Sequence, residues 1–105
     1  AAIIDGIIQS ISGIGDGACF TEPGPLGFDQ LSIVVVAMNI SNQKKIAGEL
    51  LKKLITRFRS KLLPTSIYFA ETIPRNENGK VLRYLARSCA QSGMWRLVTP
   101  EKEQP

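Results

Sequence analysis

The chain has 105 residues, a net charge of +4 and a hydrophobic content of 44%, which fits one small domain and excludes a disordered chain. It contains no histidine, which excludes Ser-His and Cys-His catalysis and most zinc sites within it. The modest positive charge permits contact with anions but does not demand nucleic acid, so no nucleic-acid partner is expected.

The cysteines and the apolar runs indicate where the protein works. Cys19 and Cys89 lie far apart without metal-ligand spacing, so we expect free thiols in a reducing cytoplasm, with a disulfide as the open alternative. Residues 1–5 lack the basic stretch that opens a signal peptide. The longest apolar run, residues 33–38, is too short to span a bilayer, so no transmembrane segment is expected.

The first half of the chain predicts a helix followed by two strands. Isoleucines recur at helical spacing in residues 1–11, and the glycines of residues 13–17 are expected to stop that helix in a loop. These glycines follow a predicted helix rather than a strand, so they are not a dinucleotide-binding fingerprint. Residues 18–21 predict a short strand, and residues 22–27 a turn rich in proline and glycine. Residues 31–40 are almost continuously apolar, which is typical of a central strand covered on both faces.

The second half predicts a long helix, a third strand, a loop and a last helix. Apolar residues recur at helical spacing over residues 45–62, with Ser41 as a candidate cap and Pro64 as the stop. Residues 66–70 predict the third strand, and residues 81–90 the last helix. The order of the elements predicts an α+β fold in which helices back a small three-stranded sheet.

The loop between the third strand and the last helix is the most informative segment. Residues 73–83 read Ile-Pro-Arg-Asn-Glu-Asn-Gly-Lys-Val-Leu-Arg. Pro74 stiffens the entry, and the Asn-Gly pair gives the backbone easy access to positive φ. Lys80 at the tip of such a turn can present a compact charge to an anion. The segment is not a P-loop, because that motif needs glycine in place of Pro74 and serine or threonine in place of Val81.

The same loop resembles the last core motif of the adenylate-forming superfamily, which comprises acyl-CoA synthetases, adenylation domains of nonribosomal peptide synthetases and firefly-type luciferases. The family pattern is roughly Leu/Ile-Pro-Arg/Lys-x-x-x-Gly-Lys-Val/Ile-x-Arg, and the matching residues are Ile73, Pro74, Arg75, Gly79, Lys80, Val81 and Arg83. The form Gly-Lys-Val-Leu-Arg is slightly more similar to acyl-CoA synthetases than to peptide synthetases. By this resemblance, residues 1–93 correspond to the small C-terminal domain of such an enzyme. Residues 94–105 are expected to be a weakly packed tail, anchored by Trp95.

The resemblance implies the C-terminal lid domain of an ATP-dependent carboxylic acid:CoA ligase that works through an acyl-adenylate. It implies ATP, CoA and Mg²⁺ as cofactors of the full-length enzyme, and CoA or a carrier-protein thiol as acceptor. Lys80 would support adenylation from an exposed, mobile loop, and Asn78, Gly79 and Arg75 would be cofactor-binding residues. The large N-terminal domain, with its nucleotide loop and acyl pocket, and the hinge are expected to precede this chain. The isolated chain is therefore expected to be inactive.

Other interpretations stay open. The parent is alternatively a peptide synthetase, or the chain is a stand-alone binding or regulatory module with a basic surface. The basic helix face within residues 44–61 has only Glu49 as an acidic member, and is either a surface for an acidic partner or an ordinary solvated face. Arg83 and Arg87, four residues apart on the last helix, either contact anions or lie on a solvated face.

Overall fold

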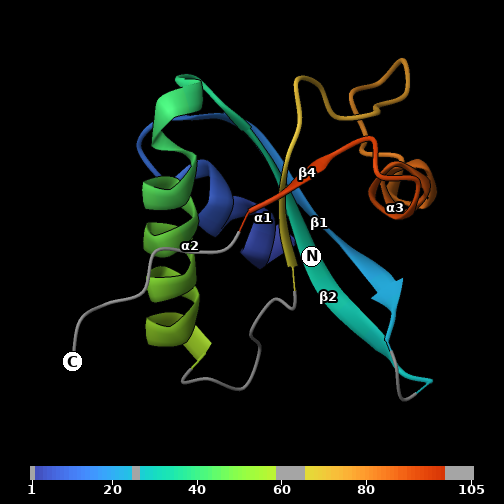
Figure 1. Ribbon diagram of the computed structural model, residues 1–105, viewed down its shortest axis with the longest axis horizontal. Coiled ribbons are helices and arrows are strands. Elements are labelled where there is room, and N and C mark those ends of the chain that lie inside the picture. The colour runs from blue at the N-terminus through green and yellow to red at the C-terminus, as the bar shows by residue number, and fades with distance from the viewer. Residues whose placement is uncertain (1, 25–26, 59–65, 99–105) are drawn as a thin grey trace.

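The computed structural model describes residues 2–24, 27–58 and 66–98, which form three α-helices and a four-stranded mixed sheet (Figure 1). The elements in chain order are α1 (Ala2–Gln9), β1 (Ile14–Pro23), β2 (Asp29–Ala37), the 3₁₀ turn η1 (Ile40–Asn42), α2 (Gln43–Phe58), β3 (Ser66–Phe69), α3 (Arg83–Gln91) and β4 (Arg96–Leu97). Among these helices, none has the length and apolar character that a membrane crossing needs.

The strands lie side by side in the order β1-β2-β3-β4. β1 and β2 form an antiparallel hairpin, β2 and β3 run parallel with α2 as the crossover, and β4 is antiparallel to β3. The α+β class is therefore confirmed. The predicted count of three strands is wrong, because the chain returns after α3 and Leu97 pairs with Tyr68. Two residues are too few to show a strand-like alternation in the sequence.

Helices cover both faces of the sheet: α1 and α2 lie on one side and α3 on the other (Figure 1). This arrangement explains the unbroken apolar run of β2. Ile33 and Val35 pack in the cluster formed with α1 and α2, whereas Val34 packs in the cluster formed with α3. Alternate residues of a strand point to opposite faces, so a strand between two helical layers must be apolar at every position. The central-strand prediction is confirmed.

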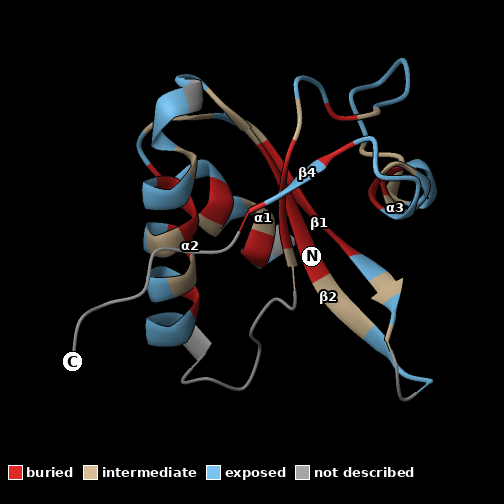
Figure 2. Ribbon diagram, viewed as in Figure 1, coloured by how far each residue is buried: buried red, intermediate tan, exposed pale blue. Residues whose placement is uncertain are grey.

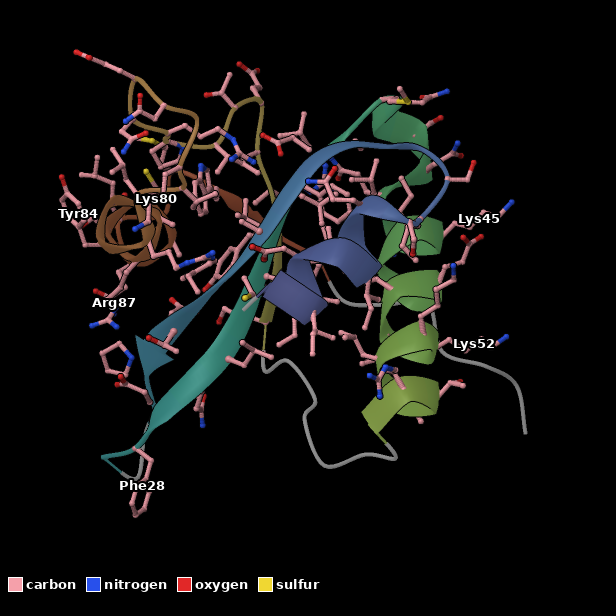
Figure 3. The ribbon with its side chains drawn as sticks, turned by 180° about the vertical axis from the view of Figure 1, so that it is seen from behind. Phe28, Lys45, Lys52, Lys80, Tyr84 and Arg87 are labelled. Carbon is pink, nitrogen blue, oxygen red and sulfur yellow. The ribbon has the colours of Figure 1, made fainter. Side chains whose placement is uncertain are left out.

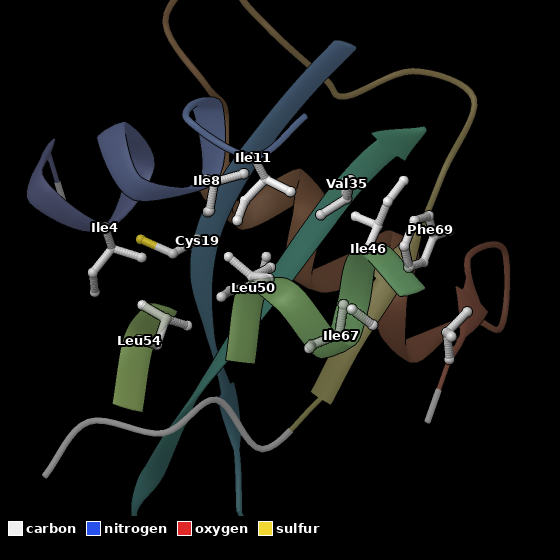
Figure 4. Packing of buried hydrophobic residues seen from close by; sticks show 13 residues of the cluster. Ile4, Ile8, Ile11, Cys19, Val35, Ile46, Leu50, Leu54, Ile67 and Phe69 are labelled. Atoms are coloured by element: carbon white, nitrogen blue, oxygen red, sulfur yellow. The ribbon is translucent and has the colours of Figure 1, made fainter. Parts of the chain in front are cut away.

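The larger apolar cluster lies between the sheet and the two helices α1 and α2 (Figure 4). Ile8 of α1 and Leu50 of α2 are both 0% exposed at its centre. Helical spacing brings Ile4 into the same cluster, while Ile3, which the sequence places on the same face, is 58% exposed. The smaller cluster lies under α3, where Trp95 is buried against the ring of Phe20 in an edge-on contact, with ring centroids 5.9 Å apart. Figure 2 shows how burial concentrates in the middle of the sheet.

The glycine-rich segment after α1 differs from its prediction. α1 already ends at Gln9, and the turn that follows it closes at Gly13, which has φ +92°. β1 then begins at Ile14, so Gly15 and Gly17 lie in a strand rather than a loop. The reason is a close approach between α1 and β1. A Cβ atom at position 17 would lie 2.2 Å from Cγ2 of Ile8, so only glycine fits there.

The start of the long helix also differs in detail. Asn39, not Ser41, is the cap: its side-chain oxygen accepts a hydrogen bond from the Ser41 N–H at 3.0 Å ahead of η1. α2 then begins at Gln43, two residues before the predicted start. The predicted end of this helix, including Pro64, lies outside the described residues, as do residues 99–105 of the predicted tail.

Candidate functional site

The predicted lysine loop is a narrow hairpin that joins β3 to α3. Arg75 and Val81 form an antiparallel bridge across its base. One step further out, the Asn76 N–H donates to the Lys80 carbonyl at 2.9 Å. Backbone pairing of Arg75 with Val81 and of Asn76 with Lys80 thus closes the hairpin below its tip.

The tip is closed by a glycine and an asparagine. Gly79 has φ +83°, the left-handed conformation that glycine adopts without strain, and its N–H donates to the Asn76 carbonyl at 3.0 Å. The side-chain oxygen of Asn76 accepts hydrogen bonds from the N–H groups of Asn78 and Lys80, at 2.9 and 3.0 Å. The role of Asn76 was not predicted from the sequence, although asparagine is a frequent turn-former that bonds to backbone N–H groups a few residues ahead.

Lys80 is exposed beside α3 (Figure 3). Its backbone is fixed by Asn76, but no described residue forms a hydrogen bond or ion pair with its ammonium group. The predicted exposure of the loop is confirmed, and its motion stays a prediction. The hairpin therefore fixes the backbone of Lys80 and leaves its ammonium group exposed, without a neutralising partner among the described residues.

Arg75 is engaged with the protein itself. Its Nε and Nη2 donate to the two carboxylate oxygens of Asp16 on β1, at 3.1 and 2.5 Å, and its Nη1 donates to the Gly79 carbonyl at 2.6 Å. The structure therefore brings together Arg75 and Gly79, both predicted site residues, with Asp16, which was not predicted to belong to the site. Asn78 lies exposed between them at the tip.

The Asp16–Arg75 pair is ionised at neutral pH. Burial raises the pKa of Asp16, but the hydrogen bonds from Arg75 and from the Gly17 N–H outweigh that effect and lower this pKa below its ordinary value. The hydrogen bond with Asp16 in turn raises the pKa of Arg75. Both groups therefore carry full charge where the loop meets β1.

The two arginines of α3 are half-buried and bond to β1 and to nearby carboxylates of the protein itself. Arg83 donates to the carbonyl of Cys19 and, at 3.0 Å, to Asp5, while Arg87 donates to the carbonyl and hydroxyl of Thr21 at 2.8 and 2.7 Å. Arg83 and Arg87 are four residues apart on the helix, which is about 6 Å, and Cys19 and Thr21 are two residues apart on the strand, which is about 6.6 Å. The two arginines are therefore spaced like the two strand residues that they bond to. These arginines thus satisfy two carbonyls of β1 that do not pair with β2.

The two cysteines form no disulfide with each other. Cys19 and Cys89 are both free thiols, and burial, reinforced by the charge of Asp5, raises the pKa of Cys19, so this thiol is a poor nucleophile at neutral pH. Within the described ranges, no group of three or more His, Cys, Asp or Glu side chains is placed to hold a metal ion.

The basic face of α2 lies on the other side of the sheet from Lys80. The exposed basic residues of this face are Lys44, Lys45, Lys52, Lys53 and Arg57. Figure 3 shows Lys45 and Lys52 pointing away from the sheet, at the side of the molecule opposite to Lys80. The hairpin and this basic face are therefore separate surfaces.

Comparison with known proteins gives structural neighbours only. No family model and no curated protein matches the chain. A fatty acyl-CoA synthetase from Mycobacterium tuberculosis has 26% sequence identity over 86% of this chain, with a TM-score of 0.71. ATP-bound MatB from Rhodopseudomonas palustris has 20% identity over 86% and a TM-score of 0.71. An o-succinylbenzoate CoA synthetase from Bacillus subtilis, bound with a product analogue, has 15% identity over 93% and a TM-score of 0.71. The chain spans 17%, 18% and 19% of these proteins, respectively.

Proposed function

We propose that this chain, which shares its fold with a segment of adenylate-forming acyl-CoA synthetases, is the C-terminal lid domain of an ATP-dependent carboxylic acid:CoA ligase. The shared fold confirms the family resemblance that residues 73–83 carry, and the small share of each enzyme that is matched fits a C-terminal domain. The observation that carries the proposal is Lys80, with a fixed backbone and an ammonium group that no described residue neutralises.

Lys80 would act by electrostatics. Adenylation brings a carboxylate to the α-phosphate of ATP, so two anions must approach and negative charge builds on the phosphate. A positioned ammonium offsets this repulsion and orients both groups, and it is most effective when water is excluded around it. In the proposed enzyme, the hairpin of this chain would insert Lys80 between the substrates held by the large domain.

The other predicted cofactor-binding residues differ in whether they are exposed or already bonded within the protein. Asn78 and Gly79 stay candidates for contact with ATP or CoA, because they lie exposed at the tip. Arg75 is the weaker candidate, because its guanidinium is occupied by Asp16 and Gly79. The described residues offer no cluster of ligands that fits magnesium, so we give this part of the chain no role in holding that ion.

A binding or regulatory module is the alternative that one observation favours. The basic face of α2 is exposed on the side of the sheet away from Lys80. It could bind an acidic partner there without any contribution from the hairpin. Under this alternative, Lys45→Ala weakens binding of an acidic polymer such as heparin, and Lys80→Ala changes neither binding nor any ligase activity.

The test is Lys80→Ala in the complete protein that carries this chain, with the two half-reactions assayed separately. We expect acyl-adenylate formation to slow by on the order of 100-fold or more, because one preorganised charge is lost. Thiol transfer from a supplied acyl-adenylate should change much less, and CoA should be compared with a carrier protein as acceptor. Glu77→Ala, a change of another exposed residue of the same hairpin, is the control and should leave both rates near wild type. Equal losses in both half-reactions, or no loss in adenylation, would remove the role proposed for Lys80.

A further inference from the structure

One side chain connects the lysine hairpin to the sheet. The guanidinium of Arg75 holds the Gly79 carbonyl, next to Lys80 in the chain, through Nη1 at 2.6 Å. Its Nε and Nη2 hold both carboxylate oxygens of Asp16 at 3.1 and 2.5 Å. A planar guanidinium bonded to a carboxylate in this two-pronged way is fixed in orientation as well as in position.

Asp16 is itself held in place by β1. The pairing of β1 with β2 is irregular between Ile14 and Asp16, and such irregularities redirect a side chain at the edge of a sheet. The carboxylate also accepts a hydrogen bond from the Gly17 N–H at 2.8 Å. Residue 17 packs directly against Ile8, so the anchor belongs to the rigid part of the molecule.

The rest of the hairpin transmits this constraint to Lys80. Asn76 accepts from the Lys80 N–H and donates to the Lys80 carbonyl, at 3.0 and 2.9 Å. The Leu82 N–H donates to the Pro74 carbonyl at 2.9 Å, which closes the base. The backbone of Lys80 is therefore fixed from within the hairpin, and the hairpin is fixed to β1 through Arg75.

We propose that Asp16 and Arg75 are positioning residues for Lys80, which set where its ammonium lies when it meets the substrates. The inference rests on the function proposed for Lys80. Neither residue is expected to touch the reacting groups, because the polar atoms of each are already bonded to the other, to the hairpin or to β1.

The expected effect on rate is large relative to the effect on stability. Both side chains are about one-third exposed, at 32% for Arg75 and 30% for Asp16, and exposed ion pairs contribute little to stability. A displacement of about 1 Å in a catalytic group can nevertheless cost up to about 100-fold in rate. If the pair served only the fold, breaking it would lower the melting temperature without a selective loss in adenylation.

The experiment is a double-mutant cycle in the complete protein. Asp16→Asn and Arg75→Lys are each made in the wild type and in Lys80→Ala, and single-turnover adenylation and thiol transfer are measured. In the wild type, each variant should slow adenylation by about 10-fold while thiol transfer stays near wild type. In Lys80→Ala, neither should slow adenylation further, because they act through the residue already removed.

Asp29→Asn is the matched control. Asp29 also pairs with an arginine, Arg87, at 3.8 Å, but it lies opposite Pro23, at the other end of the β1–β2 pairing from Asp16, so adenylation should not change. Arg75→Lys keeps the charge and serves if Asp16→Asn fails to fold. Losses that are as large in Lys80→Ala as in the wild type, or no loss in the wild type, would overturn the positioning role alone. Full adenylation by Lys80→Ala would instead contradict the proposed function of Lys80, and with it this inference.

Discussion

At the scale of single residues, the hairpin divides its tasks among neighbours of different chemistry. Gly79 supplies the left-handed backbone, Asn76 satisfies N–H groups inside the turn, and Arg75 ties the turn to β1. Only the backbone of Lys80 takes part in the hairpin's hydrogen bonds, so its ammonium group stays available for a ligand. Removal of Lys80 should therefore cost little stability, whereas changes at its neighbours act on its position.

The ionisation of Asp16 gives a prediction that needs no enzyme activity. Its pKa is lowered by Arg75 and Gly17, so an NMR titration of the carboxyl carbon should show a midpoint below the ordinary aspartate value of about 3.9. A lowered pKa means that the pair stabilises the fold above that ordinary value and ceases to do so as pH falls through the lowered one.

Arg75→Ala is the comparison for this titration. Without the guanidinium, burial favours the protonated acid, so the midpoint of Asp16 should move up. A midpoint in the wild type at or above the ordinary value, or one that is unchanged in Arg75→Ala, would mean that the pair does not form in solution.

The sequence reveals some residues of the site and hides others for a physical reason. Lys80, Gly79 and Arg75 lie within five residues of each other, so a local pattern contains them. Asp16 is 59 residues from Arg75, and only the fold brings the two together. Asn76 lies inside the local pattern and was missed, because a turn asparagine is common and its particular N–H partners depend on the closed geometry.

At the scale of elements, the apolar pattern of the sequence predicts the helices and the central strand well, but it predicts the start of β1 and the short strand β4 poorly. The long helix is predicted because apolar residues recur at helical spacing along it, and β2 because its apolar run is almost continuous. β1 was predicted to start at residue 18 instead of Ile14, because a close approach to α1 requires glycine, which otherwise indicates a loop. β4 was missed, because its pairing with β3 depends on where α3 returns the chain.

The packing of α2 gives a stability prediction. Leu50 is 0% exposed within the larger cluster, so Leu50→Ala should lower the free energy of unfolding by about 2–5 kcal/mol, the range for buried leucines. Urea unfolding followed by circular dichroism measures this change. Ile55→Ala on the same helix is the control: Ile55 is 39% exposed, so its loss should be well below that of Leu50→Ala. Similar losses for the two variants would contradict the assigned helix face.

At the scale of the whole molecule, one sheet separates two surfaces of different character. The hairpin with Lys80 lies on the side of α3, and the basic face of α2 lies on the other (Figures 1 and 3). The chain spans less than a fifth of the enzymes that share its fold. A single charge on a hairpin cannot bind ATP and a carboxylic acid by itself, so in the proposed enzyme the substrates are gripped elsewhere.

This division of labour predicts a folded but inactive isolated chain. Two apolar clusters fill both faces of the sheet, so the 105-residue chain should unfold cooperatively in urea. By family resemblance, the nucleotide loop and the acyl pocket belong to the large domain, so ATP–pyrophosphate exchange should stay at the level of a blank across a panel of carboxylic acids. The complete protein, assayed with the same panel, is the positive control. Exchange by the isolated chain well above the blank would mean that the substrates bind to this chain itself, and a non-cooperative transition would mean that the clusters need the rest of the enzyme to form.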